Sequence, residues 1–90
     1  MKYLNKFLKK QNILPQRLTL EKPDELVVAG VNAEIDSVTF VNFLLELEMY
    51  LSNEIDCDLD LFYIIENKNF ISLKIFELDT LIIDEIDKLE

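Results

Sequence analysis

One stretch of the sequence decides the fold: DSVTFVNFLLELEMYLSNEI, residues 36–55. Its apolar residues recur at the three- and four-residue spacing of one face of an α-helix. Asp36 is suited to cap this helix, because its carboxylate can accept hydrogen bonds from the first free backbone amides. The pattern predicts a helix from Ser37 to about Asn53, buried along a broad stripe of Phe40, Phe43, Leu44, Leu47 and Leu51.

A second stripe of the same helix shares the direction of Ser37 and holds Val41, Leu45, Glu48 and Ser52. Aliphatic side chains outside the main core either cover a neighbouring helix or contact a partner protein, and for Leu45 the two interpretations weigh equally. Ser37 begins the helix at the positive end of its dipole, where a negatively charged group such as a phosphodiester is favoured. Many serines begin helices without carrying a group, so this position permits a modification without requiring one.

The residues before this helix are predicted to form a short helix, a loop and one further helical turn. Met1, Leu4, Phe7 and Leu8 share one helical face. Pro15 bars a helix from continuing, so residues 11–22 are predicted to be a connecting loop. Pro23 can open a short helical turn, residues 23–29, which Gly30 then ends.

A last helix is predicted after Ser72, its N-cap, with Ile71 and Phe76 as a hydrophobic staple. Residues 56–69 fit either a short helix or a strand, and a short helix is favoured, with Phe62 and Tyr63 in the core. The periodicity leaves little room for strands, so the predicted fold class is all-α. One face of the last helix should be buried, namely Ile75, Leu78, Ile82, Ile86 and Leu89, whereas its acidic residues should keep it soluble, namely Asp79, Asp84, Glu85, Asp87 and Glu90.

The composition limits the possible functions. Ninety residues correspond to one small domain, expected to span residues 1–90. The single cysteine, Cys57, excludes an internal disulfide, and the absence of histidine leaves no usual zinc ligand set, so no metal site is expected. Because no apolar run approaches the roughly 20 residues that span a bilayer, and a lone cysteine suits a reducing compartment, a cytoplasmic protein is expected.

The charge is unevenly distributed. Residues 1–22 carry six basic side chains and one acidic side chain, whereas residues 23–90 carry three basic and seventeen acidic ones, for a net charge of −9. An acidic body repels nucleic acid and favours basic protein partners. The basic N-terminal segment could be a nucleic-acid or membrane arm, but a solvated helix face is the preferred interpretation, so neither nucleic acid nor membrane is expected as a partner.

Several motifs of this chain are similar to those of the acyl carrier protein family, which includes the peptidyl and aminoacyl carriers. Phe70-Ile71-Ser72-Leu73 is similar to the aromatic-x-Thr/Ser-aliphatic sequence that opens the last helix of the family. Asp36-Ser37-Val38 resembles the motif that opens the second helix of the family. The residues that follow that motif in the family have counterparts here at the same spacings, without a gap: Val41, Leu47-Glu48, Leu51 and Glu54-Ile55.

The resemblance implies a small four-helix bundle of acyl-carrier type with a long first loop and a short third helix. It implies that 4′-phosphopantetheine is attached to Ser37 and that Asp36 flanks the attachment point. The arm would hold acyl or aminoacyl groups as thioesters, so the chain would be a carrier rather than an enzyme. The implied partners are a phosphopantetheinyl transferase, a loading ligase and downstream biosynthetic enzymes, which would recognise a monomer through Val38, Val41, Leu45, Glu48 and Met49.

The chain departs from the family pattern both before Asp36 and within the helix that follows it, and the segment between Ile55 and Phe70 is longer than in the compact fatty-acid type. The family has a glycine two residues before the aspartate, whereas the nearest glycine here is Gly30, so the preceding loop is longer. Asn42 and Met49 stand where carboxylates are common in fatty-acid carriers. These differences favour a specialised carrier with dedicated partners. The rival interpretation is an unmodified acidic helical module that binds a protein.

One acidic segment imitates a metal site. Asp56-Cys57-Asp58-Leu59-Asp60 resembles the start of a calcium-binding loop, but Leu61 stands where that loop needs glycine and Asn67 where it needs glutamate. A solvated acidic loop is therefore preferred.

Overall fold

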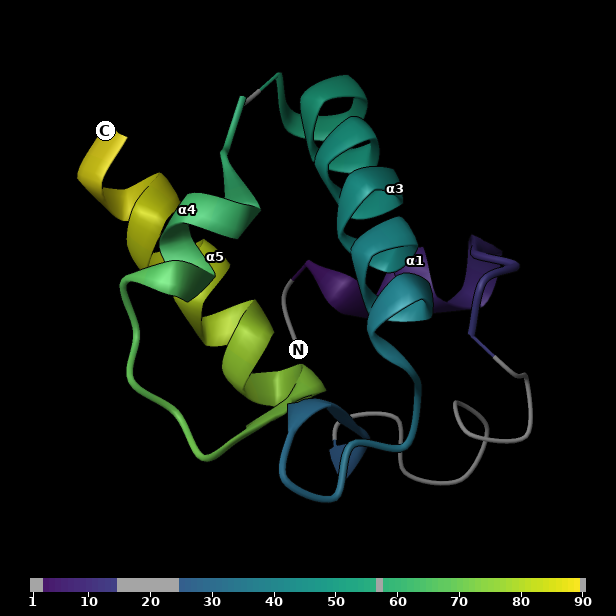
Figure 1. Ribbon diagram of the computed structural model, residues 1–90. Helices are drawn as coiled ribbons and strands as arrows, with labels where there is room; N and C mark the ends of the chain where they lie inside the picture. The colour runs from purple at the N-terminus through teal and green to yellow at the C-terminus, as the bar shows by residue number, and fades with distance from the viewer. Residues whose placement is uncertain (1–2, 15–24, 57, 90) are drawn as a thin grey trace.

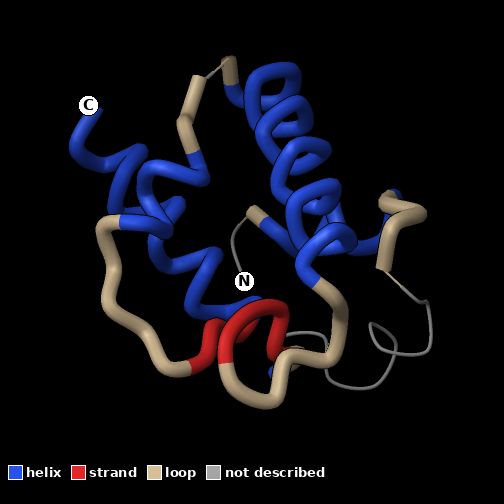
Figure 2. The backbone as a smooth tube through the Cα atoms, viewed as in Figure 1, coloured by secondary structure: helices blue, strands red, loops and turns tan. Residues whose placement is uncertain are grey.

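Two long helices, α3 (Ser37–Ile55) and α5 (Ile75–Leu89), dominate the computed structural model (Figure 1). The structure describes residues 3–14, 25–56 and 58–89. Within them lie two shorter helices, α1 (Leu4–Lys10) and α4 (Leu61–Glu66), and two short strands, β1 (Val27–Gly30) and β2 (Ser72–Lys74). The chain is therefore predominantly helical, with a small sheet at one end (Figure 2).

Helix α3 confirms the prediction made from its apolar spacing. It runs to Ile55 and ends where Asp56 adopts the left-handed conformation, with φ at 51° and ψ at 47°. This conformation is a common way to end a helix. The predicted stripe faces the core: Phe43, Leu44, Leu47 and Leu51 are buried, and Phe40 is half-buried.

The sheet corrects the expectation of an all-α fold. Strands β1 and β2 are antiparallel, with Ala29 opposite Leu73, Gly30 opposite Ser72, and an irregularity between Val27 and Ala29. The prediction of a helical turn up to Ala29 is wrong, because this segment is extended and pairs with residues more than forty positions later. The predicted opening at Pro23 lies outside the described residues.

Gly30 allows the two strands to approach closely. Its φ of +88° is rarely adopted by residues with a side chain, and a Cβ atom there would overlap the carbonyl oxygen of Ile71 and lie 2.9 Å from the Cα of Ser72. The same Ile71 oxygen accepts a 2.8 Å hydrogen bond from the Val31 N–H. Gly30 therefore ends a strand and does not end a helix.

The start of α5 also differs from the prediction. Ser72 lies in β2 and is not an N-cap; the helix begins at Ile75, directly after the strand. The Glu77 carboxylate accepts a 3.1 Å hydrogen bond from the Lys74 N–H, which is the return half of a capping box. The predicted staple is absent, because Ile71 and Phe76 are exposed. Sheet pairing holds Ser72 in an extended conformation, so the helix starts later.

The remaining buried face of α5 matches the prediction. Ile75, Leu78, Ile82 and Ile86 are buried in the core, whereas the side chain of Leu89 lies outside the described residues. This face packs with buried side chains from α1, α3 and α4 in one hydrophobic cluster. Asp84 and Asp87 are exposed, as expected of residues that keep the helix soluble.

Asp79 is the exception on α5. Its side chain is buried, and its carboxylate accepts hydrogen bonds from the backbone N–H groups of Tyr3 and Leu4, at 2.8 and 3.0 Å. The prediction that Asp79 is a solubilising residue is therefore wrong. It satisfies amides at the start of α1, which has no side-chain cap of its own.

Helix α1 packs against α3 through aromatic contacts. The ring of Phe7 lies 5.3 Å from the ring centroids of both Phe43 and Tyr50. Leu4, Phe7 and Leu8 are buried, as the spacing predicts. Met1 and most of the predicted first loop, residues 15–22, lie outside the described residues.

Helix α4 resolves the ambiguity of residues 56–69 in favour of a short helix. Its N-cap, Asp60, accepts a 3.1 Å hydrogen bond from the Tyr63 N–H. Leu61, Ile64 and Ile65 are buried, but Tyr63 is exposed and Phe62 is half-buried, so the prediction that both rings belong to the core is wrong for Tyr63. Cys57 lies outside the described residues. Within the part of the chain that the structure describes, no helix combines the length and apolar character needed to cross a membrane.

Candidate functional site

The candidate site begins with the cap of α3. Asp36 has an extended backbone, and its Oδ1 accepts a 2.7 Å hydrogen bond from the Thr39 N–H. Its own carbonyl accepts the first helical bond, 3.0 Å from the Phe40 N–H. The Thr39 backbone hydrogen bond holds the pKa of Asp36 below its ordinary value. The cap predicted from the sequence is confirmed.

Ser37 occupies the first position of this nineteen-residue helix, and its side chain is exposed. The backbone N–H groups of Ser37 and Val38 have no acceptor within the helix, because a helix leaves its first amides unpaired. These amides and the helix dipole together favour a negative charge beside the Ser37 hydroxyl. The site can therefore accommodate an anionic group attached to that oxygen.

The loop that leads into Ser37 is a closed turn. Glu34 is joined to Val27 twice: its N–H donates to the Val27 carbonyl at 2.8 Å, and its carboxylate accepts from the Val27 N–H at 3.0 Å. Asn32, within the turn, has a positive φ of 64°. The loop before Ser37, which is longer than the corresponding loop of the family, is thus held to β1 by these two hydrogen bonds. No local sequence pattern predicted this role of Glu34.

Four of the five predicted recognition residues lie on the surface. Val38 and Met49 are the most exposed, at 69% and 61%, and Val41 and Leu45 are also exposed. With Ser37 they cover about a third of the circumference of α3, by the helical rotation between their positions. Leu45 is only partly covered by its neighbours, because about half of its surface is open to solvent.

Glu48, the fifth predicted recognition residue, is half-buried. Its Oε1 is buried and has no hydrogen-bond partner among the described residues. Burial raises the pKa of Glu48, the negative charge of Asp60 raises it further, and the backbone N–H of Leu61 partly opposes the shift. Its carboxylate therefore faces the segment before α4 as well as solvent. The sequence could not reveal this, because it depends on where that segment packs.

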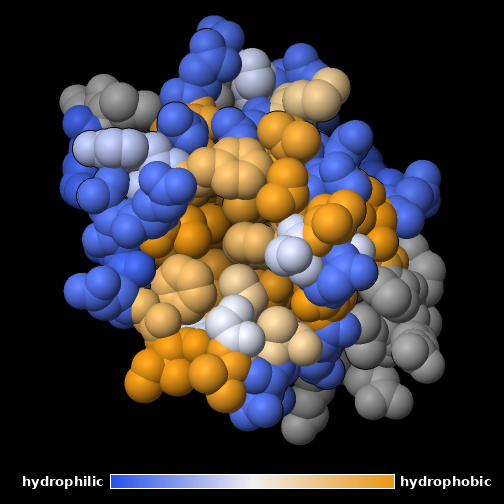
Figure 3. Space-filling view, in the orientation of Figure 1, coloured by the Kyte–Doolittle hydropathy of each residue, from blue (hydrophilic) through white to orange (hydrophobic). Residues whose placement is uncertain are grey.

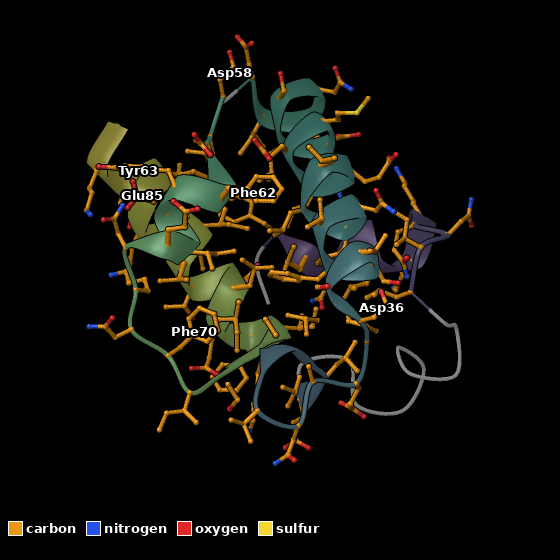
Figure 4. All side chains as sticks on the ribbon, viewed as in Figure 1. Asp36, Asp58, Phe62, Tyr63, Phe70 and Glu85 are labelled. Atoms are coloured by element: carbon orange, nitrogen blue, oxygen red, sulfur yellow. The ribbon has the colours of Figure 1, made fainter. Side chains whose placement is uncertain are left out.

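A groove of about 650 Å³ runs beside Glu48, between the second half of α3 and the start of α4. Phe62 points from α4 toward α3 (Figure 4). The Ser52 hydroxyl donates a 3.0 Å hydrogen bond to Asp58 and so links the two walls. On the surface, an apolar band crosses the middle of this face (Figure 3). The α3 wall consists of Leu45, Glu48, Met49 and Ser52, and the opposite wall of Asp58, Leu59, Asp60 and Phe62.

The described acidic residues near this groove take part in hydrogen bonds within the protein. Within residues 3–14, 25–56 and 58–89, no group of three or more histidine, cysteine, aspartate or glutamate side chains could hold a metal ion. Asp58 and Asp60 are instead engaged with Ser52 and with the N-terminus of α4.

The chain was compared with known proteins at the level of families, individual sequences and folds. No protein-family model, no curated protein and no solved structure matches it.

Proposed function

We propose that the protein is a carrier that holds acyl or aminoacyl groups on a 4′-phosphopantetheine arm attached to Ser37. The observation that carries this proposal is the exposed Ser37 hydroxyl at the first position of α3, directly after a formed Asp36 cap. An enzyme that transfers a group to this oxygen needs it to be accessible. The phosphodiester that results would lie beside unpaired amides at the positive end of the helix.

The family-like motif supports the same assignment. The gapless series from Asp36 to Ile55 coincides with the whole of α3, which begins after Asp36 and ends at Ile55. A carrier-type bundle is part of the proposal: α1, α3, α4 and α5 would be its four helices, with α4 as the short third one. The short sheet would then be an addition that joins residues 27–30 to the segment just before α5.

In this proposal, the residues around Ser37 have different roles. Asp36 holds the cap and so fixes the backbone from which the Ser37 side chain extends. Val38 and Val41 offer apolar surface beside the attachment point to a transferase, a loading ligase and later enzymes. The arm, when attached, supplies the thiol that forms thioesters; the chain itself contributes position and exposure and is not expected to catalyse a reaction.

The test is the intact mass of the protein after coexpression with a broad-specificity phosphopantetheinyl transferase. We expect a mass gain equal to one phosphopantetheine group, lost in Ser37→Ala and kept in Ser52→Ala, which removes a hydroxyl at the other end of the same helix. If no transferase, including one from the same source as the protein, adds the group, or if Ser37→Ala gains the same mass, the carrier assignment fails.

The second candidate function is an unmodified acidic module that binds a protein partner. The exposed apolar side chains of α3 favour it independently of any modification, since such surfaces mark protein interaction sites. The same mass measurement separates the two candidates, because a binding module gains no mass at Ser37.

A further inference from the structure

We infer that the cavity between the segment before β2 and the first turns of α5 is a docking site for an acidic segment of a partner protein, which inserts one large apolar side chain. The cavity is lined by no residue of α3 and by none of the residues assigned above to modification or recognition. The inference therefore does not rest on the carrier assignment.

The cavity has a volume of about 300 Å³ and a mainly apolar wall. Phe70 lies between the segment before β2 and α5 (Figure 4), and the wall continues through Leu73, Phe76 and Leu81. Ligand cavities range from roughly 300 to 1,000 Å³, so this one suits a single anchoring side chain. An aromatic anchor fits best, because aromatic rings contact one another favourably in offset or edge-on arrangements, here with Phe70 and Phe76.

Apolar surface continues outside the cavity. Ile71 and Phe76 are 81% and 43% exposed. Val31, which is 57% exposed, lies beside Ile71, since its N–H donates the 2.8 Å hydrogen bond to the Ile71 carbonyl. Figure 3 shows apolar surface along the lower left of this face, where the segment before β2 runs in Figure 1. Such exposed apolar surface beside a cavity is typical of an interaction site.

The charge around the cavity selects an acidic partner. Two of the three lysines within residues 23–90 lie here: Lys68 lines the cavity, and the Nζ of Lys74 lies 6.0 Å from the centre of the Phe76 ring. Glu77 also lines the cavity, but its carboxylate accepts the 3.1 Å hydrogen bond from the Lys74 N–H. The two lysines therefore complement carboxylates that flank the anchor.

A short protein segment is favoured over nucleic acid or anionic lipid. Both of those present many phosphates, and the net charge of −9 repels an extended anion. A short segment meets mainly the local lysines, because exposed charges more than about 8 Å apart are largely screened at physiological salt. The occupant is therefore a protein segment with one apolar anchor and neighbouring carboxylates.

The experiment titrates the isotope-labelled protein with a short peptide that has one central phenylalanine flanked by glutamates, and follows the backbone amides by two-dimensional NMR. We expect shifts within residues 68–81. Two matched peptides, one with lysine in place of glutamate and one with serine in place of phenylalanine, should bind there at least about tenfold more weakly. The net charge of the protein favours the lysine peptide, so attraction to net charge would give the opposite order.

Three results of this titration would overturn the inference. They are no shift within residues 68–81 at about 1 mM peptide, equal effects of the three peptides, and equal shifts from a single-stranded oligonucleotide. The last result would assign the lysines to nucleic acid.

Lysine variants test the charged part of the site. Lys68→Gln with Lys74→Gln should weaken binding of the glutamate peptide roughly fivefold. Lys6→Gln with Lys9→Gln makes the same charge change at exposed positions of α1 and should leave the affinity nearly unchanged. An equal loss in both double variants, or no loss in either, contradicts the proposed site.

Ring variants test the apolar part. Phe76→Ala should weaken binding at least about tenfold, whereas Tyr63→Ala, which removes an exposed ring from α4, should not. Ser37→Ala should bind as the unchanged protein does, and a loss there would place the peptide at the start of α3 and overturn the inference. The amide spectrum of each free variant shows whether it is folded; if Phe76→Ala is unfolded, the lysine variants decide.

Discussion

The Asp79 carboxylate in α5 accepts a 3.0 Å hydrogen bond from the backbone N–H of Leu4, the first residue of α1, across 75 positions of sequence. It accepts a second bond from Tyr3 at 2.8 Å. One buried side chain near the end of the chain thus satisfies the free amides of the first helix and fixes α1 against α5.

Replacing Asp79 should therefore destabilise the protein strongly. We expect Asp79→Ala to lower the free energy of unfolding by about 3 kcal/mol, because two hydrogen bonds to a charged acceptor are lost and buried amides are left unpaired. Urea denaturation followed by circular dichroism measures the change. Asp87→Ala, on the exposed side of the same helix, should change it by less than about 0.5 kcal/mol. Similar values for the two variants would contradict the structural role of Asp79.

Gly30 should tolerate no side chain. Gly30→Ala forces a positive φ on alanine and places its Cβ against the Ile71 carbonyl, so we expect a loss of about 2–4 kcal/mol in unfolding free energy. Asn32 provides the matched control, since it also has a positive φ but already carries a Cβ. Asn32→Gly should be neutral within about 0.5 kcal/mol, as measured by thermal and urea unfolding. A neutral Gly30→Ala would mean that the two strands do not approach as described.

The charge of Glu48 should make stability depend on pH. Its pKa is higher in the folded state than the ordinary value of 4.5, chiefly because burial disfavours the charged form. At a pH near these two pKa values, the folded state then binds more protons than the unfolded state. The stability that protonated Glu48 contributes is therefore fully present below pH 4.5 and is lost as pH rises through the folded pKa. We expect Glu48→Gln to raise Tm at neutral pH and to have little effect in acid.

Differential scanning calorimetry at acidic and neutral pH measures this difference. Glu46→Gln, which removes an exposed carboxylate from the same helix, serves as the control and should leave Tm nearly unchanged at both pH values. If Glu48→Gln lowers Tm at neutral pH, the carboxylate must be stabilised by an interaction that outweighs its burial.

Val38 should affect recognition without affecting stability. Its side chain is 69% exposed, so Val38→Asp removes no core packing, and a negative charge in the first turn of a helix is favourable. If Ser37 is modified by a transferase, we expect this variant to be modified about tenfold more slowly, which corresponds to about 1.4 kcal/mol of lost contact. Time-resolved intact mass gives the rate. Asn42→Asp adds the same charge one turn later and should have a smaller effect; a larger effect would place the contact elsewhere.

Local patterns predicted α3 and most of the core because both depend on the spacing of apolar residues along one helix. The cap at Asp36 was likewise predictable, since its partner Thr39 lies three residues away. The sheet was not, because β1 and β2 are short and their pairing joins distant segments. Two adjacent valines, Val27 and Val28, were a weak signal for a strand.

The errors at Ser72 and Asp79 share a physical cause. Ser72 suits a helix cap by its residue type, but pairing with Gly30 draws it into a strand. Aspartate is a residue type usually found on the surface, and Asp79 is a buried acceptor only because α1 packs against it. Glu48 became half-buried for the same reason, through the placement of Asp60 and Leu61. Each depends on tertiary contacts that no short window of sequence contains.

The turn that precedes Ser37 has a consequence for the order of events during biosynthesis. Its strand, β1, is completed by residues 72–74, which leave the ribosome long after α3. The approach to Ser37 therefore takes its final shape only after residues 72–74 have been synthesised. Any enzyme that requires this shape would leave shorter nascent chains, those without residues 72–74, unmodified.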